Sequence, residues 1–310
     1  MGYKIKVDSS RYIMYKQNNH IMKLNGRRES SHVEDRRGMS GGAKAGVGGI
    51  GAIIIIALVT LAQGGSITDV VNNVFQQQLQ GQVTEQTGSG QTSFTKDEEE
   101  AATFSKQVLG SLEDVWTEQF MQHGMTYSYP TMVLFTGTVS TACGTGSAQM
   151  GPFYCSGDEK LYLDLSFFAD MKKQFGININ DKNSFAYAYV IAHEVGHHVE
   201  YLRGILGKAH SEMNQVSTEE ANKISVKLEL LADYYAGCWA HYENEKYKSL
   251  SDNDLREAVD AAKKIGDDYL QKQAKGYACP ETFTHGTSEQ RMYWLKKGFE
   301  SGDWNTTTFE

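Results

Sequence analysis

An uncharged apolar run, from Ala45 to Ala62, constrains this chain more than any other feature. Its 18 residues would form a helix about 27 Å long, close to the hydrocarbon thickness of a bilayer. A cleavable signal peptide fits poorly, because the segment that precedes the run is far longer than a usual basic leader. A buried core helix also fits poorly, because the run is apolar on all faces and a polar, Gly-rich stretch follows it. The run therefore predicts one transmembrane helix, at residues 45–63.

The charge of the chain divides at this run. The whole chain carries −8, but residues 1–44 hold ten basic and four acidic side chains and so carry +6, which leaves −14 for the rest. By the positive-inside rule, the basic head at residues 1–44 is expected in the cytoplasm and the acidic body outside it. We therefore expect a single-pass protein of the cell membrane with an extracytoplasmic catalytic domain. A mildly acidic chain is a poor candidate for nucleic-acid binding, which usually needs clustered Lys and Arg.

The rest of the chain divides into a linker and a folded body. Residues 64–94 are rich in Gln, Gly, Thr and Ser, cannot bury enough apolar surface to fold, and are predicted to be a flexible linker. The body at 95–310 is predicted to be α+β, mainly helical with a small sheet. Strands are expected at 129–141 and 160–168, on either side of a Gly-rich loop at 144–152. Helices are expected at 95–123, from 183 or 184 to about 206, at 218–244, at 252–275 and from 287 to 297, with capping boxes opening the first and the last.

One segment of the body carries a metal-binding motif, His193-Glu194-Val195-Gly196-His197, of the form H-E-x-x-H. Residues four apart share one face of a helix, so His193 and His197 can bind one metal ion. Glu194 can then reach a metal-bound water as a general base. The preceding residues 185–192 are apolar on every face, which indicates a buried helix, where these polar side chains are costly unless they are paired or bound. The alternative is a pair of neutral core histidines.

Zinc at such a site needs a third protein ligand and an open position for water. Our candidate is Glu229, because leucines, alanine and tyrosines surround it in a downstream helix, which is unusual for a solvated carboxylate. Asp233 lies one turn further on the same face and could accept a hydrogen bond from a ligand histidine, in the first place His193. The competing carboxylates, in more polar surroundings, are Glu219, Glu220 and Glu243. His198 and Glu200 are expected to point away from the metal, although either could support a ligand from behind.

A third group of residues lies near the C-terminus. His285 comes just before the last helix, and Arg291 lies on the first turns of that helix. A histidine placed there could donate a hydrogen bond to the oxyanion of a tetrahedral intermediate and so be catalytic. The alternative is a surface histidine beside a structural arginine. Other candidate donors are Tyr187, Tyr189 and Tyr201.

All four cysteines lie in the body, at Cys143, Cys155, Cys238 and Cys279. They are too few for a disulfide scaffold. Cys143 and Cys155 bracket the Gly-rich loop and could form a disulfide outside the cell, with two free thiols as the alternative.

These motifs and the stretches around them resemble the predicted neutral zinc metallopeptidase family of membrane-anchored bacterial proteins. Besides the apolar run, the matching stretches are GRRESSHVEDRRG (26–38), GPFYCSGDEKLYLDLSFF (151–168), AYVIAHEVGHHVE (188–200), ELLADYYAGCWAH (229–241) and FTHGTSEQRMYWLKKGFESGD (283–303). The resemblance implies a zincin-like fold with one Zn²⁺, the ligands His193, His197 and Glu229, and Glu194 as the base. The chain is also similar, more remotely, to zinc peptidases in which a His…Arg pair follows the third ligand, as His285 and Arg291 do here.

The chain departs from the family pattern in its second pair of cysteines. That pattern has a cysteine at the position of Tyr234, which pairs with one near the C-terminus. Here Cys238 and Cys279 are present instead and are candidates for a second bridge.

Taken together, the sequence predicts a membrane-tethered zinc metalloendopeptidase that hydrolyses peptide bonds in a protein or peptide substrate, with Glu194 as general base on a zinc-bound water. One alternative is a membrane-anchored scaffold or binding protein that contains zinc. Another is a zinc amidase that acts on cell-wall peptides. An edge strand within 161–168 is expected to bind substrate by strand addition. The sequence leaves the oligomeric state open.

Overall fold

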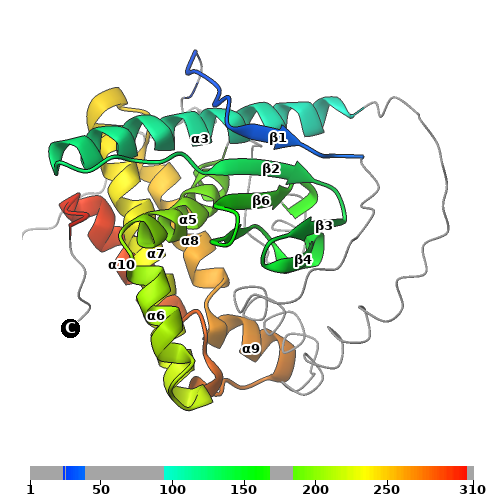
Figure 1. The fold of residues 1–310 in the computed structure, drawn as a ribbon, viewed down its shortest axis with the longest axis vertical. Coiled ribbons are helices and arrows are strands. Elements are labelled where there is room, and N and C mark those ends of the chain that lie inside the picture. The colour runs from blue at the N-terminus through cyan, green and yellow to red at the C-terminus, as the bar shows by residue number, and fades with distance from the viewer. Residues whose placement is uncertain (1–23, 25, 39–93, 168–183, 306–310) are drawn as a thin grey trace, which may run out of the picture.

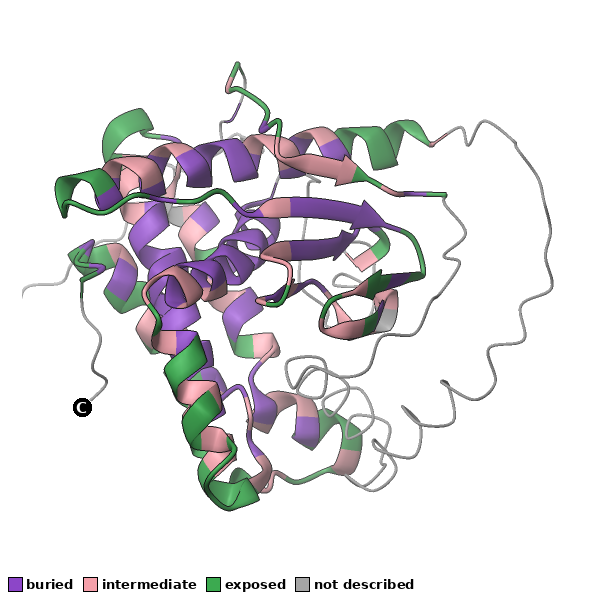
Figure 2. Cartoon of the chain, viewed as in Figure 1, coloured by how far each residue is buried: buried purple, intermediate pink, exposed green. Residues whose placement is uncertain are grey.

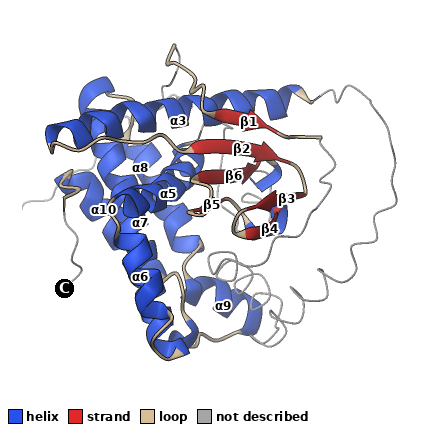
Figure 3. Cartoon of the chain, viewed as in Figure 1, coloured by secondary structure: helices blue, strands red, loops and turns tan. Residues whose placement is uncertain are grey.

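The computed structural model describes residues 24, 26–38, 94–167 and 184–305 (Figure 1). Helices make up most of this part of the chain and lie beside a small sheet (Figure 3). The predicted α+β class, mainly helical with a small sheet, is confirmed. No helix among the described residues is long and apolar enough to cross a membrane. The predicted span at 45–63, and the linker up to residue 93, lie outside those residues.

The main sheet has four strands in the order β1–β2–β6–β5. Strands β1, β2 and β6 run parallel, and β5 runs antiparallel to β6. Their bounds are Val33–Asp35 for β1, Thr131–Phe135 for β2, Phe153–Cys155 for β5 and Lys160–Asp164 for β6. A separate antiparallel hairpin consists of β3 (Thr138–Thr141) and β4 (Gly144–Ser147).

The two faces of the sheet contact different cores, because successive side chains of a strand point to opposite sides. Met132 and Leu134 of β2 face the large helical core, together with Leu161 and Leu163 of β6. The residues between them face a smaller cluster, which is completed by the hairpin and β5 and consists of Val133, Phe135, Val139, Phe153, Cys155 and Tyr162. The sheet is therefore buried on both faces.

The strands differ from the prediction in three places. A turn at Gly137 divides the expected strand 129–141 into β2 and β3, and the expected loop 144–152 contains β4. The strand expected at 160–168 ends at Asp164, whose carboxylate accepts the backbone N–H groups of Gly137 and Ser166. β6 also lies inside the sheet, between β2 and β5, so it is not the expected edge strand. Among the described residues, the edges are β1 and β5.

Four helices contribute most of the helical core (Figure 2): α3 (Lys96–Gln122), α5 (Phe185–Leu202), α7 (Thr218–Tyr247) and α10 (Ser288–Ser301). Helix α7 packs against both α5 and α10. The capping boxes at Thr95 and Thr287 are confirmed, and Ser184 caps α5. Helix α5 is buried over most of its length, as its apolar sequence predicts.

Two of the predicted helices are shorter than expected because glycines interrupt them. The helix expected to reach 206 ends at Leu202, and Gly204, with φ of 71°, separates it from α6 (Ile205–Met213). The helix expected at 252–275 is two helices, α8 (Asp252–Lys264) and α9 (Asp267–Lys275), separated at Gly266. A Cβ on Gly266 would lie 2.4 Å from the backbone nitrogen of Ser288. Glycine therefore allows this junction to approach the start of α10, which brings Asp267 beside the loop that carries His285.

Residues 24 and 26–38, predicted as part of a separate basic head, lie on the body instead. Their strand β1 pairs with β2, and Arg27 forms an ion pair of 2.7 Å with the buried Glu243 of α7. Arg37 lies over the ring of Phe94 and donates to Glu99 at the start of α3. Arg27 and Arg37 thus pair with acids of the body, which a count of charges along the sequence does not reveal.

One disulfide is present among the described residues. Cys143 and Cys155, with Cα atoms 5.8 Å apart, join the turn of the β3–β4 hairpin to the end of β5. The candidate bridge between Cys238 and Cys279 is not formed, and both are free thiols. Cys238 is buried within α7, where burial raises the pKa of its thiol. It packs as a small apolar residue of the core.

Candidate metal centre

The close crossing of α5 and α7 brings the motif helix to its partner carboxylates. Gly196, inside the H-E-x-x-H motif, lies against Ala232 of α7. A Cβ at position 196 would lie 2.8 Å from the carbonyl oxygen of Ala232 and 2.9 Å from its Cα. Because both of these atoms belong to the backbone, a larger residue would push the helices apart. Ala232 stands between Glu229 and Asp233 in the sequence, so this contact places both carboxylates beside the motif.

His193, His197 and Glu229 form one buried cluster. The Nε2 atom of His193 lies 3.1 Å from Glu229 Oε2, and that of His197 lies 3.5 Å from Oε1. One ligand atom from each of the three residues lies within 4.8 Å of the others. Two imidazoles and a carboxylate are a donor set that suits zinc. The residues present therefore fit a metal ion, as the sequence predicted.

Asp233 lies behind the cluster and accepts hydrogen bonds from three side chains. His193 donates from Nδ1 to Asp233 Oδ1 at 2.8 Å, and Tyr189 donates to the same oxygen at 2.5 Å. Arg291 forms a fork, with Nε 2.8 Å from Oδ2 and a terminal nitrogen 2.9 Å from Oδ1. Because Nδ1 is held by Asp233 in this way, Nε2 is the nitrogen of His193 that faces a metal.

The charges around Asp233 and His193 shift the pKa values of these two residues in opposite directions. Burial alone would raise the pKa of Asp233, but the Arg291 charge and then His193 outweigh it and hold the pKa at about 2. For His193, burial lowers the pKa, while the charge and hydrogen bond of Asp233 raise it to about 9. Asp233 is therefore a stable anion that orients both His193 and Arg291.

Glu194 is buried next to the cluster, and burial raises the pKa of its carboxyl group against the opposing charges of His193 and His197. The three competing carboxylates lie elsewhere. Glu219 and Glu220 are exposed and contact Lys223, and Glu243 is bound to Arg27. Of the four candidate third ligands, only Glu229 joins the two histidines.

His285 is buried and faces the same cluster. Its Nε2 lies 3.9 Å from Glu229 Oε1. Burial lowers the pKa of His285, but the Glu229 charge and the interactions with Asp267 together outweigh burial and raise it. Its Nδ1 lies 2.8 Å from the Thr284 hydroxyl and 3.6 Å from Asp267 Oδ1. It is therefore not the surface histidine of the alternative interpretation. Arg291 is also part of the site, because it donates hydrogen bonds to Asp233.

Asp267 is a residue that the sequence reasoning missed. Its Oδ2 accepts the backbone N–H groups of Thr284, His285 and Gly286, at 2.8, 2.6 and 3.0 Å. It thereby fixes the loop that carries His285. The one local signal was the Gly-Asp sequence at 266–267, but the separation of 18 positions between Asp267 and His285 hides their contact.

The two polar neighbours of the motif behave differently from each other. His198 points away from the metal cluster, as predicted, and bonds Tyr154 of β5 and the carbonyl of Ser128. Glu200 does not point away, because its carboxylate accepts a hydrogen bond of 2.9 Å from His197 Nδ1. Of the alternative tyrosine donors, Tyr189 is bound to Asp233, and Tyr201 is bound to Glu159.

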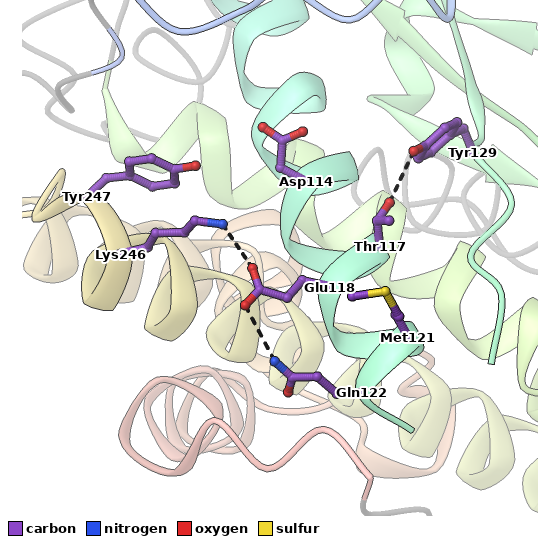
Figure 4. Close-up of a pocket in the computed structure, with 8 residues that line it drawn as sticks. All are labelled: Asp114, Thr117, Glu118, Met121, Gln122, Tyr129, Lys246 and Tyr247. Atoms are coloured by element: carbon purple, nitrogen blue, oxygen red, sulfur yellow. Dashed lines mark hydrogen bonds and ion pairs between the residues drawn. The ribbon is translucent and has the colours of Figure 1, made fainter. Parts of the chain in front are cut away.

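A separate pocket lies between α3 and the C-terminal end of α7 (Figure 4) and contains no residue of the metal cluster. Lys246 is paired with Glu118 at 2.9 Å, and Thr117 with Tyr129 at 3.2 Å. Because these polar groups bond one another, we assign the pocket no role in the site.

The fold and the cluster define a class of protein. Two buried histidines from an H-E-x-x-H helix and a buried glutamate from a second helix are the ligand arrangement of zinc peptidases that keep one coordination position open. The chain belongs to the family described as "Putative neutral zinc metallopeptidase", whose model matches residues 22–309.

Proteins of Escherichia coli and Mycobacterium tuberculosis are similar in sequence to this chain. The chain is 43% identical over 290 residues to the uncharacterized protein YpfJ of Escherichia coli (strain K12), which covers 91% of this chain and 96% of that protein. It is 43% identical over 188 residues to the uncharacterized protein Rv2575 of Mycobacterium tuberculosis, covering 58% of this chain and 61% of that one. No solved structure matches the chain.

Proposed function

We propose that this chain is a zinc-dependent endopeptidase of zincin-like architecture that hydrolyses peptide bonds in a protein or peptide substrate. The observation that supports this most strongly is the joining of His193, His197 and Glu229 in one cluster, with Glu194 beside it. Membership of a zinc metallopeptidase family supports the same activity. One zinc ion per chain is expected, since the described residues contain one such group.

In this proposal each residue has a distinct task. When bound, zinc would supply a Lewis acid that polarises the substrate carbonyl. Glu194 takes a proton from the attacking water and passes it to the leaving amine, a task that suits a buried carboxylate of raised pKa. His285, held by Asp267, donates a hydrogen bond to the developing oxyanion. Asp233 and Arg291 hold His193 in the tautomer that leaves Nε2 free for the metal.

Strand β5 is the best place for a substrate to bind by strand addition. It is an edge strand of the described sheet, unlike β6, where the sequence placed this role. Tyr154 of β5 bonds His198 of α5, so the strand lies against the motif helix. An extended peptide paired with β5 would run past that helix, with its backbone bonded to the sheet edge.

The direct test replaces the general base and leaves the ligands in place. Glu194→Gln should retain stoichiometric zinc, measured by metal analysis, and lose turnover by at least a hundredfold, about the contribution of a positioned acid–base group. Chelation should abolish the wild-type activity, and zinc should restore it. The matched control is Glu219→Gln, an exposed carboxylate on α7 that should behave as wild type. Full activity in Glu194→Gln would refute the mechanism.

The same pair of variants identifies substrates. Proteomes of cells that express wild type or Glu194→Gln should differ in specific protein fragments. A zinc amidase would instead change cell-wall peptides while the proteome stayed constant. A zinc-containing scaffold would give no difference in either, and its metal would have four protein ligands.

Attachment to the cell membrane through residues 45–63 stays a prediction. We propose that, where the chain meets a membrane, residues 26–38 and the catalytic body lie on the same side, because β1 belongs to the sheet of the body. This differs from the expected arrangement, with residues 1–44 in the cytoplasm and the body outside.

A further inference from the structure

Glu200 is a buried carboxylate without an assigned task. Its side chain is 0% exposed, and Oε2 accepts the Nδ1 hydrogen of His197 at 2.9 Å. Its other oxygen, Oε1, is buried and has no hydrogen-bond partner among the described residues. Transferring a carboxylate from water to such a place costs several kcal/mol, so Glu200 requires an explanation.

The bond gives His197 the same arrangement that Asp233 gives His193. In both histidines Nδ1 donates to a buried carboxylate while Nε2 faces Glu229. The carboxylate fixes the ring orientation and the tautomer, and it increases the basicity of the Nε2 atom. The two supports differ in origin, because Asp233 comes from α7 whereas Glu200 lies three residues after His197 on α5 itself.

A purely structural role explains Glu200 poorly. The bond to His197 joins two residues of one helix, so it does not connect α5 to any other element. A pair of this kind adds little to the stability of an exposed helix. That gain does not offset the burial of a charge, so the stability of α5 does not explain why a glutamate stands at position 200.

We propose that Glu200 is a positioning residue, which holds His197 in the orientation and tautomer that bind the metal. The inference rests on the proposed zinc site, and it adds a second carboxylate–histidine pair to the one formed by Asp233. It assigns each histidine of the motif its own buried carboxylate.

The test measures zinc affinity without any substrate, by competition with a chromophoric chelator, on wild type, Glu200→Gln and Glu200→Ala. We expect Glu200→Gln to bind zinc about tenfold more weakly and Glu200→Ala up to about 100-fold, the range seen when such partners of a metal ligand are removed. Glutamine keeps the volume and an acceptor oxygen, so it folds even where alanine does not. Cobalt-substituted protein should show a shifted visible absorption band in both variants.

The matched control is Glu243→Gln, which also alters a fully buried glutamate but one bound to Arg27 and Ser111, away from the cluster. This variant should unfold at lower temperature and bind zinc as wild type does. Wild-type zinc affinity and an unchanged cobalt band in folded Glu200→Gln would overturn the inference and leave the peptidase proposal intact. A wild-type protein that binds no zinc would overturn both.

Discussion

Asp267 acts at the scale of single atoms, because one carboxylate organises the loop in front of α10. Three consecutive backbone N–H groups point to its Oδ2, and Oδ1 faces the imidazole of His285. None of the three metal-cluster residues contacts Asp267 directly. Loss of its charge should therefore disturb His285 and spare the metal.

We predict that Asp267→Asn lowers kcat at least tenfold, because removal of an oxyanion donor typically costs a hundredfold or more. Zinc affinity should be unchanged. Steady-state kinetics and a chelator competition measure the two quantities. Asp268→Asn is the control, since that neighbouring carboxylate bonds Ser288 and not the His285 loop. An active-site role for the loop would be excluded if both variants turned over substrate at the wild-type rate.

Single residues were predictable from the sequence where helical spacing alone places them. His193 and His197 are four apart on one helix, and Glu229 and Asp233 are four apart on another, so local geometry suffices to pair them. Asp267 depends on how distant helices pack, which no local pattern contains. Arg291 was a candidate from its place beside His285, but its bond to Asp233 depends on the same packing. Glu200 was within reach, because a side chain three residues after His197 lies on the adjacent face.

At the scale of elements, the crossing of α5 over α7 determines whether the ligands meet. Gly196 is the contact point, and Ala232 opposite it lies between the two carboxylates that serve the site. The sequence predicted both helices but not their crossing, because the packing distance is set by residues from each. For the same reason it could not foresee that β6 lies inside the sheet and β5 at its edge.

We predict that Gly196→Ala destabilises the fold by about 1–3 kcal/mol, the usual range for an overpacked contact. It should also weaken zinc binding, because Glu229 is displaced from the histidines. Thermal unfolding and metal titration measure these effects. Gly207→Ala is the control. Gly207 is also a helical glycine, but a Cβ there would find nothing to contact within 4 Å. Equal stability of both variants would show that the helices do not approach as closely as described.

At the scale of the whole molecule, residues 26–38 stabilise the body as one of its own parts. Arg27 reaches Glu243 of α7, Arg28 reaches Glu113 of α3, and β1 extends the sheet. The two glutamates are buried, so each depends on its arginine to compensate its charge. In the sequence an apolar run stands between this stretch and the body, and the pairing of β1 with β2 reveals that the stretch and the body fold together.

We predict that Arg27→Ala lowers the free energy of unfolding by about 3 kcal/mol, because it leaves Glu243 buried without its partner. Arg36→Ala, in the same stretch, should cost less than about 1 kcal/mol, since Arg36 pairs with the half-exposed Glu34. Denaturant titration distinguishes these values. A small effect of Arg27→Ala would mean that residues 26–38 are not held against α7 in solution.

The meeting of Arg37 with Phe94 and Glu99 has a consequence for how the polypeptide can be divided. Arg37 and Phe94 stand on either side of residues 39–93, which lie outside the described part of the chain, and they are neighbours on the body. A cut anywhere between them breaks the covalent link and none of the contacts described for either side. The N-terminal fragment would then stay bound by its parallel strand and by the pairs of Arg27 and Arg28 with two buried glutamates. Supplied separately, it should restore the fold of a body that lacks it, as in fragment complementation.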